Sequence, residues 1–356
     1  MSIPPPSAEA QLAFLTKLQR LFAEGDFTAT YKFALLIALA DLAVEQGTDT
    51  GDELQLTTRQ VAERFIQLYW RQAAPYGTGR LDTEPGVLVQ NLGAQAAVVA
   101  AIAAFRAKVR TASPQVAALH PDYAKLLSAV AQTVTAQPLN YLQNFGGGTD
   151  EFLYTRTPGK VLLKSGVAFC LRRFQPLVNQ LARSHWVTHI KGNRRNQTIL
   201  GEADDLEEFL FETSRQSLAL LGAELRKLDG PKCFYCGQGI ASAEVDHFIP
   251  FAHYPRDLAH NFVLAHPACN RSKSDMLAAK RHLQRWLTRL LERSDDIAAI
   301  GRQVGMVADG SVSRRVASWG YSGAVAAGAR AWLEPNLFER VDNSYVQLIA
   351  QTETTE

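Results

Sequence analysis

The chain has 356 residues, of which 47% are hydrophobic and 20% are charged, so a wholly disordered, collagen-like or disulfide-rich protein is excluded. At about 150 residues per domain, this length has room for about two domains. The longest apolar stretch, residues 33–43, contains Asp41 and is shorter than the ~18 residues that span a membrane. The first residues, MSIPPPSAEAQ, do not resemble a secretory signal. We therefore expect no membrane association, a cytoplasmic location and reduced cysteines.

The first 145 residues show the apolar spacing of helices. Leu, Ile, Val, Ala and Phe recur every three or four residues, and Thr57 stands where it could cap a helix. Residues 1–150 carry 11 Lys and Arg against 13 Asp and Glu, which disfavours wrapping of DNA by this part. We expect a helical, regulatory or partner-binding domain over residues 1–145, acting through a protein partner or self-association. The predicted helices are residues 7–24, 30–46, 57–73, 94–110 and 121–135.

Three consecutive glycines, Gly146 to Gly148, mark the predicted end of this domain, because such a run costs too much backbone entropy inside a helix or strand. A middle region, residues 150–230, follows. Residues 152–156 and 160–163 alternate around a Thr-Pro-Gly turn and predict a hairpin. Helices are predicted over residues 167–183 and 206–228.

Two short pairs of metal-ligand residues follow. Cys233 and Cys236 form a C-x₂-C pair, and His266 and Cys269 form an H-x₂-C pair. Two such pairs can direct four ligands at one ion, as a tetrahedral zinc site requires. Gly237 would help the first pair to turn tightly. The spacing predicts a structural zinc ion bound by a closed Cys₃His set, which performs no chemistry itself.

Four polar residues are expected to meet between and beside the zinc ligands. Asp246 and His247 follow Val245 near the end of a short apolar strand, and Asn261 precedes a second strand, residues 262–264. Asn270 directly follows the last zinc ligand at the start of a helix. Two strands, a zinc site and a helix would bring the four polar side chains together.

Residues 231–293 resemble the HNH endonucleases, whose nuclease core has the zinc-containing ββα-metal fold. The resemblance rests on C-x₂-C, then Asp-His, then Asn, then H-x₂-C-Asn-x-x-Lys. It implies that His247 is the general base for water, that Asn261 orients the His247 loop and that Lys273 supports phosphate. It further implies that Asp246 and Asn270 hold one catalytic divalent ion. Oxygen ligands would favour Mg²⁺ or Mn²⁺.

A basic stripe is predicted after the core. Residues 231–293 carry nine Lys and Arg against five Asp and Glu, and residues 276–291 are expected to continue as a helix. Arginines spaced by four residues would lie on one face of it and could contact DNA phosphates, although a solvated face is nearly as good an interpretation. These are Arg281, Arg285, Arg289 and Arg293.

The expected fold is α+β and mainly α-helical, with the small ββα-metal (treble-clef-like) nuclease core over residues 231–293 and a C-terminal helical extension over residues 294–356. The favoured function is metal-dependent hydrolysis of DNA phosphodiester bonds. A non-catalytic zinc module that binds DNA or protein is the alternative, and an RNA substrate stays open. The whole chain also loosely resembles bacterial restriction or phage-defence nucleases.

Overall fold

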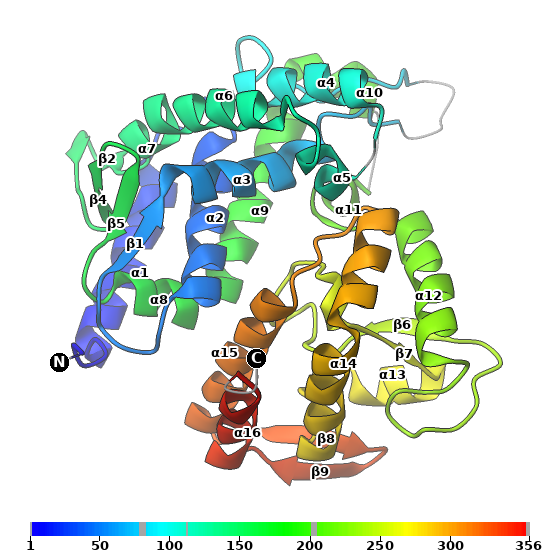
Figure 1. Ribbon diagram of the computed structural model, residues 1–356. Coiled ribbons are helices and arrows are strands. Elements are labelled where there is room, and N and C mark those ends of the chain that lie inside the picture. The colour runs from blue at the N-terminus through cyan, green and yellow to red at the C-terminus, as the bar shows by residue number, and fades with distance from the viewer. Residues whose placement is uncertain (1, 78–82, 112, 201–204, 354–356) are drawn as a thin grey trace. The chain divides into compact units, whose positions relative to one another are not determined.

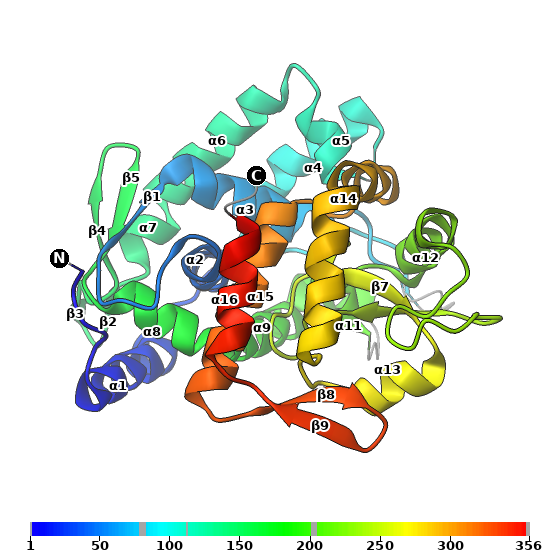
Figure 2. The ribbon, with the colours of Figure 1, turned by 60° about the horizontal axis from the view of Figure 1, so that its bottom comes forward.

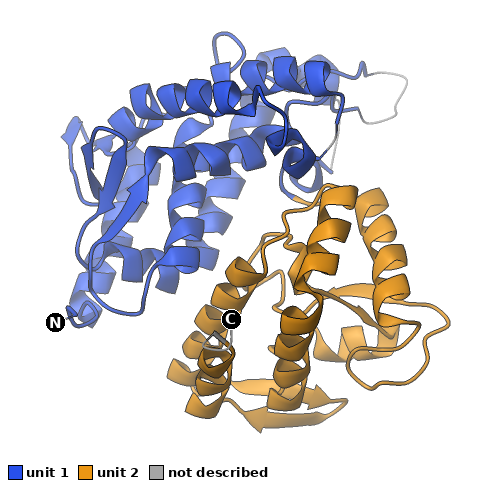
Figure 3. Cartoon of the chain, in the orientation of Figure 1, with its two compact units in different colours: residues 1–211 blue, residues 212–356 orange. Residues whose placement is uncertain are grey.

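The computed structural model describes residues 2–77, 83–111, 113–200 and 205–353. The chain divides into two compact units, unit 1 (Met1–Phe211) and unit 2 (Glu212–Glu356) (Figures 1 and 3). Both are mainly helical with small antiparallel sheets, so the α+β, mainly α class expected from the sequence holds. None of the described helices is long and apolar enough to cross a membrane.

Unit 1 is built around α2, whose apolar residues lie on all sides of the helix, as in a helix buried on every face. It packs against α9, α8 and α3 (Figure 1). The five helices predicted from spacing in this part all form, and Thr57 caps α3 in a reciprocal capping box with Gln60. The helices of unit 1 are α1 (Ala8–Glu24), α2 (Tyr31–Gln46), α3 (Thr58–Trp70), α4 (Ala97–Val109), α5 (Pro114–Ala118), α6 (Tyr123–Ala136), α7 (Pro138–Tyr141), α8 (Val167–Arg173), α9 (Gln175–Gly192), η1 (Arg194–Asn196), α10 (Gln197–Leu200) and α11 (Leu206–Phe211).

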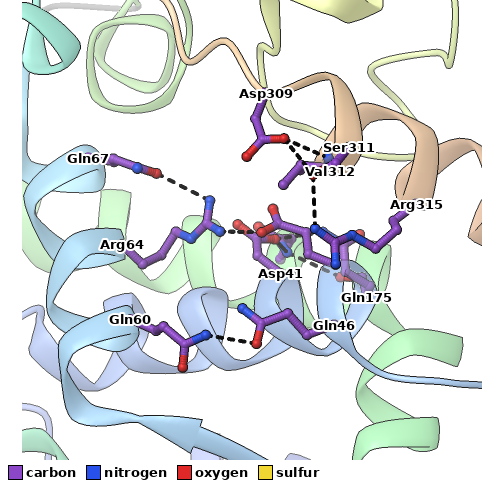
Figure 4. A network of polar contacts seen from close by, with 12 residues as sticks. Asp41, Gln46, Gln60, Arg64, Gln67, Gln175, Asp309, Ser311, Val312 and Arg315 are labelled. Carbon is purple, nitrogen blue, oxygen red and sulfur yellow. Dashed lines mark hydrogen bonds and ion pairs between the residues drawn. The ribbon is translucent and has the colours of Figure 1, made fainter. Parts of the chain in front are cut away.

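The acidic side chains of the buried α2 are hydrogen-bonded to neighbouring helices of unit 1. Asp41 Oδ1 accepts a 3.0 Å hydrogen bond from Gln175 Nε2, and the Arg64 guanidinium donates to Glu45 at 2.5 Å (Figure 4). Gln60 donates to Gln46 beside this group. These pairs offset the cost of desolvating charged groups inside the helical core.

The predicted boundary near residue 145 is wrong. Strand β1 (Leu54–Thr57) pairs antiparallel with β5 (Lys160–Leu163), and β5 pairs with β4 (Tyr154–Thr157), so one sheet joins the two predicted regions. The hairpin β4–β5 itself is as predicted. Gly146 and Gly147, at φ of +62° and +78°, form the two-residue turn between β2 (Asn144–Phe145) and β3 (Gly148–Thr149). The glycines serve a tight hairpin turn rather than a linker.

Two predicted helices are interrupted, and a third begins later than predicted. Residues 167–183 divide into α8 and α9 at Phe174, just before Pro176, because a proline fits the first turn of a helix but not its interior. Residues 206–228 divide at Ser214, whose side chain caps α12. Residues 276–291 do not continue the preceding helix: α13 ends at Lys273 and α14 begins at Lys280.

Unit 2 contains a two-stranded antiparallel hairpin followed by α13, and a second hairpin, β8–β9, lies against α13 (Figure 2). The predicted C-terminal helical extension thus also contains a hairpin. The elements of unit 2 are α12 (Arg215–Asp229), β6 (Glu244–His247), η2 (Ala259–Asn261), β7 (Phe262–Ala265), α13 (Pro267–Lys273), α14 (Lys280–Val304), α15 (Gly310–Ala326), β8 (Arg330–Glu334), β9 (Leu337–Arg340) and α16 (Asn343–Glu353).

Candidate active site

The four predicted zinc ligands lie together. The ligand atoms of Cys233, Cys236, His266 and Cys269 are all within 4.8 Å of one another. The turn after the first pair closes with Gly237 at φ +75°, and its N–H donates to the Cys233 carbonyl at 2.9 Å. Since four soft or borderline donors surround one point, the donor set fits a tetrahedral zinc ion.

Neighbouring groups orient the histidine ligand. His266 Nδ1 lies 3.3 Å from Cys236 Sγ, and the opposite ring nitrogen, Nε2, lies 3.1 Å from the carbonyl oxygen of Gly239. A carbonyl only accepts, so Nε2 carries the proton and Nδ1 faces the thiols with its lone pair. A backbone acceptor behind a metal-binding histidine commonly fixes its tautomer in this way.

The thiols are electrostatically unequal. Burial raises the pKa of a thiol, but the main-chain N–H groups of Cys236, His266 and Tyr235 bring the pKa of Cys233 down to about 7. Burial and the neighbouring Cys233 thiolate raise the pKa of Cys269 to about 12. A bound divalent cation would relieve this repulsion, because it stabilises several thiolates at one point.

The hairpin beside the cysteines places Asp246 and His247. β6 pairs antiparallel with β7, with Asp246 opposite Val263 and His247 opposite Phe262. Side chains alternate along a strand, so Asp246 and His247 point to opposite faces. His247 packs against the Phe262 ring at 4.3 Å between centroids, and its side chain is 22% exposed.

Asn261 fixes the loop that follows His247. Its Oδ1 accepts from the N–H of Ile249 and its Nδ2 donates to the Ile249 carbonyl, both at 2.8 Å. Phe248 N–H also donates to the Asn261 carbonyl at 2.7 Å. These contacts hold the backbone of the loop that follows His247.

Asp257 is a site residue to which the sequence analysis gave no role. Its Oδ1 lies 2.6 Å from His247 Nε2, and its Oδ2 accepts from the N–H of Thr213 at 3.1 Å. Burial raises the pKa of this carboxyl, but the hydrogen bonds from His247 and Thr213 more than offset that effect and leave the pKa lowered. The carboxylate is therefore charged near neutral pH and holds the proton of His247 on Nε2. Nδ1 hydrogen-bonds to none of the described residues.

Asp246 does not have the open position of a metal ligand. Tyr235 donates to its Oδ2 at 2.5 Å, and Lys273 Nζ lies 3.1 Å from the same oxygen. Lys273 is fully buried and also donates to the His247 carbonyl at 2.8 Å. The phosphate-contacting role implied for Lys273 is therefore wrong in this structure, because its ammonium faces inward and neutralises Asp246.

Asn270, the other implied ligand of a catalytic ion, is held by Glu244. Its Nδ2 donates to Glu244 Oε2 at 2.9 Å, which leaves Oδ1 directed elsewhere. Among the described residues, only the Cys₃His group brings three or more His, Cys, Asp or Glu ligand atoms together. In this arrangement Asp246 is neutralised by Lys273, and Asn270 is held by Glu244 through its Nδ2.

The predicted arginine stripe is not uniform. Arg289 is buried, and its guanidinium donates to both carboxylate oxygens of Asp229 at 2.7–3.1 Å, so its expected contact with DNA is wrong. Arg281 and Arg285 are exposed. Arg281 pairs with Glu334 at 3.2 Å, and Arg285 donates to the carbonyls of Phe234 and Tyr235. Two arginines thus lie at the surface beside the cysteines and one supports the core.

Arg281 and Arg285 also line a hollow of about 440 Å³ next to the metal-binding group. Cys236 and Cys269 form part of its wall, together with residues of the β8–β9 hairpin. The metal-binding group is therefore adjacent to the surface that carries these two arginines.

Two family models match the chain. One, described as "Domain of unknown function (DUF8808)", matches residues 11–210, and the other, described as HNH endonuclease, matches residues 233–276. The second match covers both pairs of metal-binding residues together with Asp246, His247 and Asn261. It indicates a nuclease or nucleic-acid-binding module with a metal site. Comparison with curated proteins and with solved structures found no match.

Proposed function

We propose that this chain, which belongs to the DUF8808 family through residues 11–210, is an endonuclease. Because an HNH domain follows at residues 233–276, we propose that it hydrolyses DNA with His247 as general base. The observation that carries the proposal is the 2.6 Å contact between His247 and Asp257. It directs the unprotonated ring nitrogen of His247 away from the carboxylate.

His247 has the protonation pattern that a general base needs. With Nε2–H donating to Asp257, Nδ1 carries the lone pair that would take a proton from an attacking water molecule. Asp257 would then stabilise the imidazolium that forms, as a buried carboxylate does for a catalytic histidine. We assign Asp257 a positioning role and His247 the catalytic one.

The surrounding structure supports a fixed position for this histidine. Asn261 clamps the loop after it, Lys273 holds its carbonyl, and the Cys₃His group closes the base of the same hairpin. A general base must lie within hydrogen-bond reach of the proton that it removes, so rigidity at this point favours catalysis.

If a divalent ion such as Mg²⁺ or Mn²⁺ were bound, it would supply positive charge to neutralise the phosphate and the leaving oxygen. Asp246 is paired with Lys273, so we derive no step through such an ion. Arg281 and Arg285, both exposed, are the residues that we propose for contact with the DNA backbone.

The test is cleavage of supercoiled plasmid by the purified full chain, with added Mg²⁺, with added Mn²⁺ and with neither. Linear duplex, single-stranded DNA and RNA are assayed beside it. His247→Ala should reduce cleavage by roughly 10²–10⁴-fold, because it removes the base without touching the zinc ligands. The matched control is His120→Ala, a histidine of unit 1. Wild-type cleavage by the His247 variant would overturn the proposal.

The alternative is a zinc module that binds nucleic acid or protein without cutting it. The buried pair of Asp246 and Lys273 is the observation in its favour, since it engages a carboxylate that the family resemblance assigns to the catalytic ion. DNA binding by the parent chain, with no cleavage under any of the metal conditions, would favour this alternative function.

We further propose that the nuclease acts in phage defence, with unit 1 binding a partner protein or a second copy of the chain. Phage plating on cells with the parent or the His247→Ala gene tests that role.

A further inference from the structure

Unit 1 contains a hollow that the nuclease proposal does not use. It has a volume of about 380 Å³, within the ~300–1,000 Å³ range of small-molecule sites. It lies between the segment before α2, the first turn of α2 and the residues around α7. Its lining residues include Asp26, Lys32, Gln137, Tyr141 and Asn144.

The N-terminus of α2 opens into this hollow without a cap. The hydroxyl of Thr30, at the N-cap position, is engaged by Tyr69 at 2.7 Å and by Gln90 at 3.1 Å, so it does not bond to the first turn. The main-chain N–H groups of Tyr31 and Lys32 donate to none of the described residues, and the first turn holds no acidic side chain. The positive end of this 16-residue buried helix therefore has no side-chain cap and no carboxylate in its first turn, and Asp26 is the acidic residue that lines the hollow.

A buried cation adds to this positive potential. Lys32 is 9% exposed, and its ammonium makes no hydrogen bond or ion pair with the part of the chain that the structure describes. The ammonium makes a cation–π contact with the Phe27 ring, whose centroid lies 5.4 Å from Nζ. Burial lowers the pKa of Lys32, against an attraction from Asp26. A cation–π contact offsets only part of the desolvation cost of an ammonium, so an anion in the hollow would be stabilised.

The other lining groups indicate the rest of the ligand. A bare phosphate would fill only a small part of the hollow. The Tyr141 ring is half-exposed and offers an apolar face, whereas Gln137 and Asn144 offer amides and Asp26 can accept from a hydroxyl or amino group. We propose that the hollow binds a small phosphorylated molecule with hydroxyl or amino donors, of the mononucleotide class, with its phosphate against the first turn of α2 and Lys32.

The test measures whether a ligand stabilises the full chain, with the midpoint of thermal unfolding as the readout. Inorganic phosphate and the four common nucleoside 5′-monophosphates are each titrated at constant ionic strength against a chloride control. A molecule that binds only the native state raises the unfolding midpoint with concentration. We expect a rise with phosphate and a larger rise with at least one mononucleotide.

Two variants locate the site. Lys32→Gln should remove the ligand-induced rise while leaving the unliganded midpoint unchanged or higher, because it removes an unpaired buried charge. Tyr141→Ala should remove the additional effect of the mononucleotide and keep that of phosphate. Lys160→Gln, at an exposed position on β5, is the control and should respond as the parent does. No rise in the parent, or an equal rise in parent and Lys32→Gln, would overturn the inference whatever the nuclease assay gives.

Discussion

Lys273 Nζ donates a 2.8 Å hydrogen bond to the main-chain carbonyl of His247, from a side chain that is fully buried. The last residue of α13 thereby holds the last residue of β6. The same ammonium neutralises Asp246, on the face of the strand opposite His247. A lysine placed to contact phosphate in the sequence pattern instead supports the backbone of the candidate general base.

This arrangement predicts strong coupling between Asp246 and Lys273. Lys273→Met should destabilise unit 2 by about 3–5 kcal/mol, because it leaves a buried carboxylate unpaired. Adding Asp246→Asn should recover part of that loss. Denaturant unfolding of both single variants and the double variant measures the coupling energy. Additive effects of the two substitutions would show that the pair is not an interacting unit.

Asp257→Asn is expected to impair catalysis more than folding. An amide can donate to His247 Nε2 and so favours the tautomer whose proton lies on Nδ1, which cannot act as the base. Cleavage should fall by roughly 10²–10⁴-fold, mainly in kcat, while zinc content and KM stay close to those of the parent. Asp295→Asn, at an exposed position on α14, is the control. A change confined to KM would argue against a positioning role.

Acid should remove the contribution of Asp257 to stability. Its pKa is lowered in the folded chain, so the carboxylate contributes stability that is fully present above the ordinary value of about 4 and is lost as pH falls through the lower folded value. Below about pH 5, the difference in unfolding free energy between parent and Asp257→Asn should shrink as pH falls. A difference that grows as pH falls below about 5 would contradict the assigned hydrogen bond between Asp257 and His247.

Zinc is expected at about one ion per chain, measured by elemental mass spectrometry. Cys233→Ser or Cys269→Ser should lose the ion and unfold the region around β6, β7 and α13, because structural zinc contributes its binding energy to folding. Cys170→Ser, a free cysteine outside the ligand set, should keep the zinc. A zinc-free chain that is folded and active would contradict the site.

Arg281 and Arg289 should behave differently. Arg289→Ala removes hydrogen bonds to Asp229 and should cost about 2 kcal/mol of stability, since hydrogen bonds to charged groups contribute about 1.5–3 kcal/mol. Arg281→Ala should instead weaken DNA binding for every sequence alike and reduce the salt-dependence slope by about one. Binding measured against salt concentration separates the two, and an unchanged slope for Arg281→Ala would remove it from the interface.

Local spacing was sufficient to determine several features. The apolar period predicted α1, α2, α3, α4 and α6 within a few residues, and the two pairs of metal ligands were predicted because residues three apart in a tight turn share a side. Strand β6, which holds Asp246 and His247, and its partner β7 were likewise predicted from short apolar runs. In each case the deciding interactions lie within a few residues of chain.

The tertiary structure decided the rest. Pairing of β1 with β5 moved the domain boundary to Phe211, since hydrogen bonds between strands far apart in sequence leave no local pattern. The contact of Asp257 with His247 depends on how an irregular loop returns to the strand. Lys273 and Arg289 are of residue types that usually lie at the protein surface. In this structure each is buried and paired with a carboxylate from another element. Sequence spacing places a charge on a helix face, but only packing determines whether that face meets water or an opposite charge.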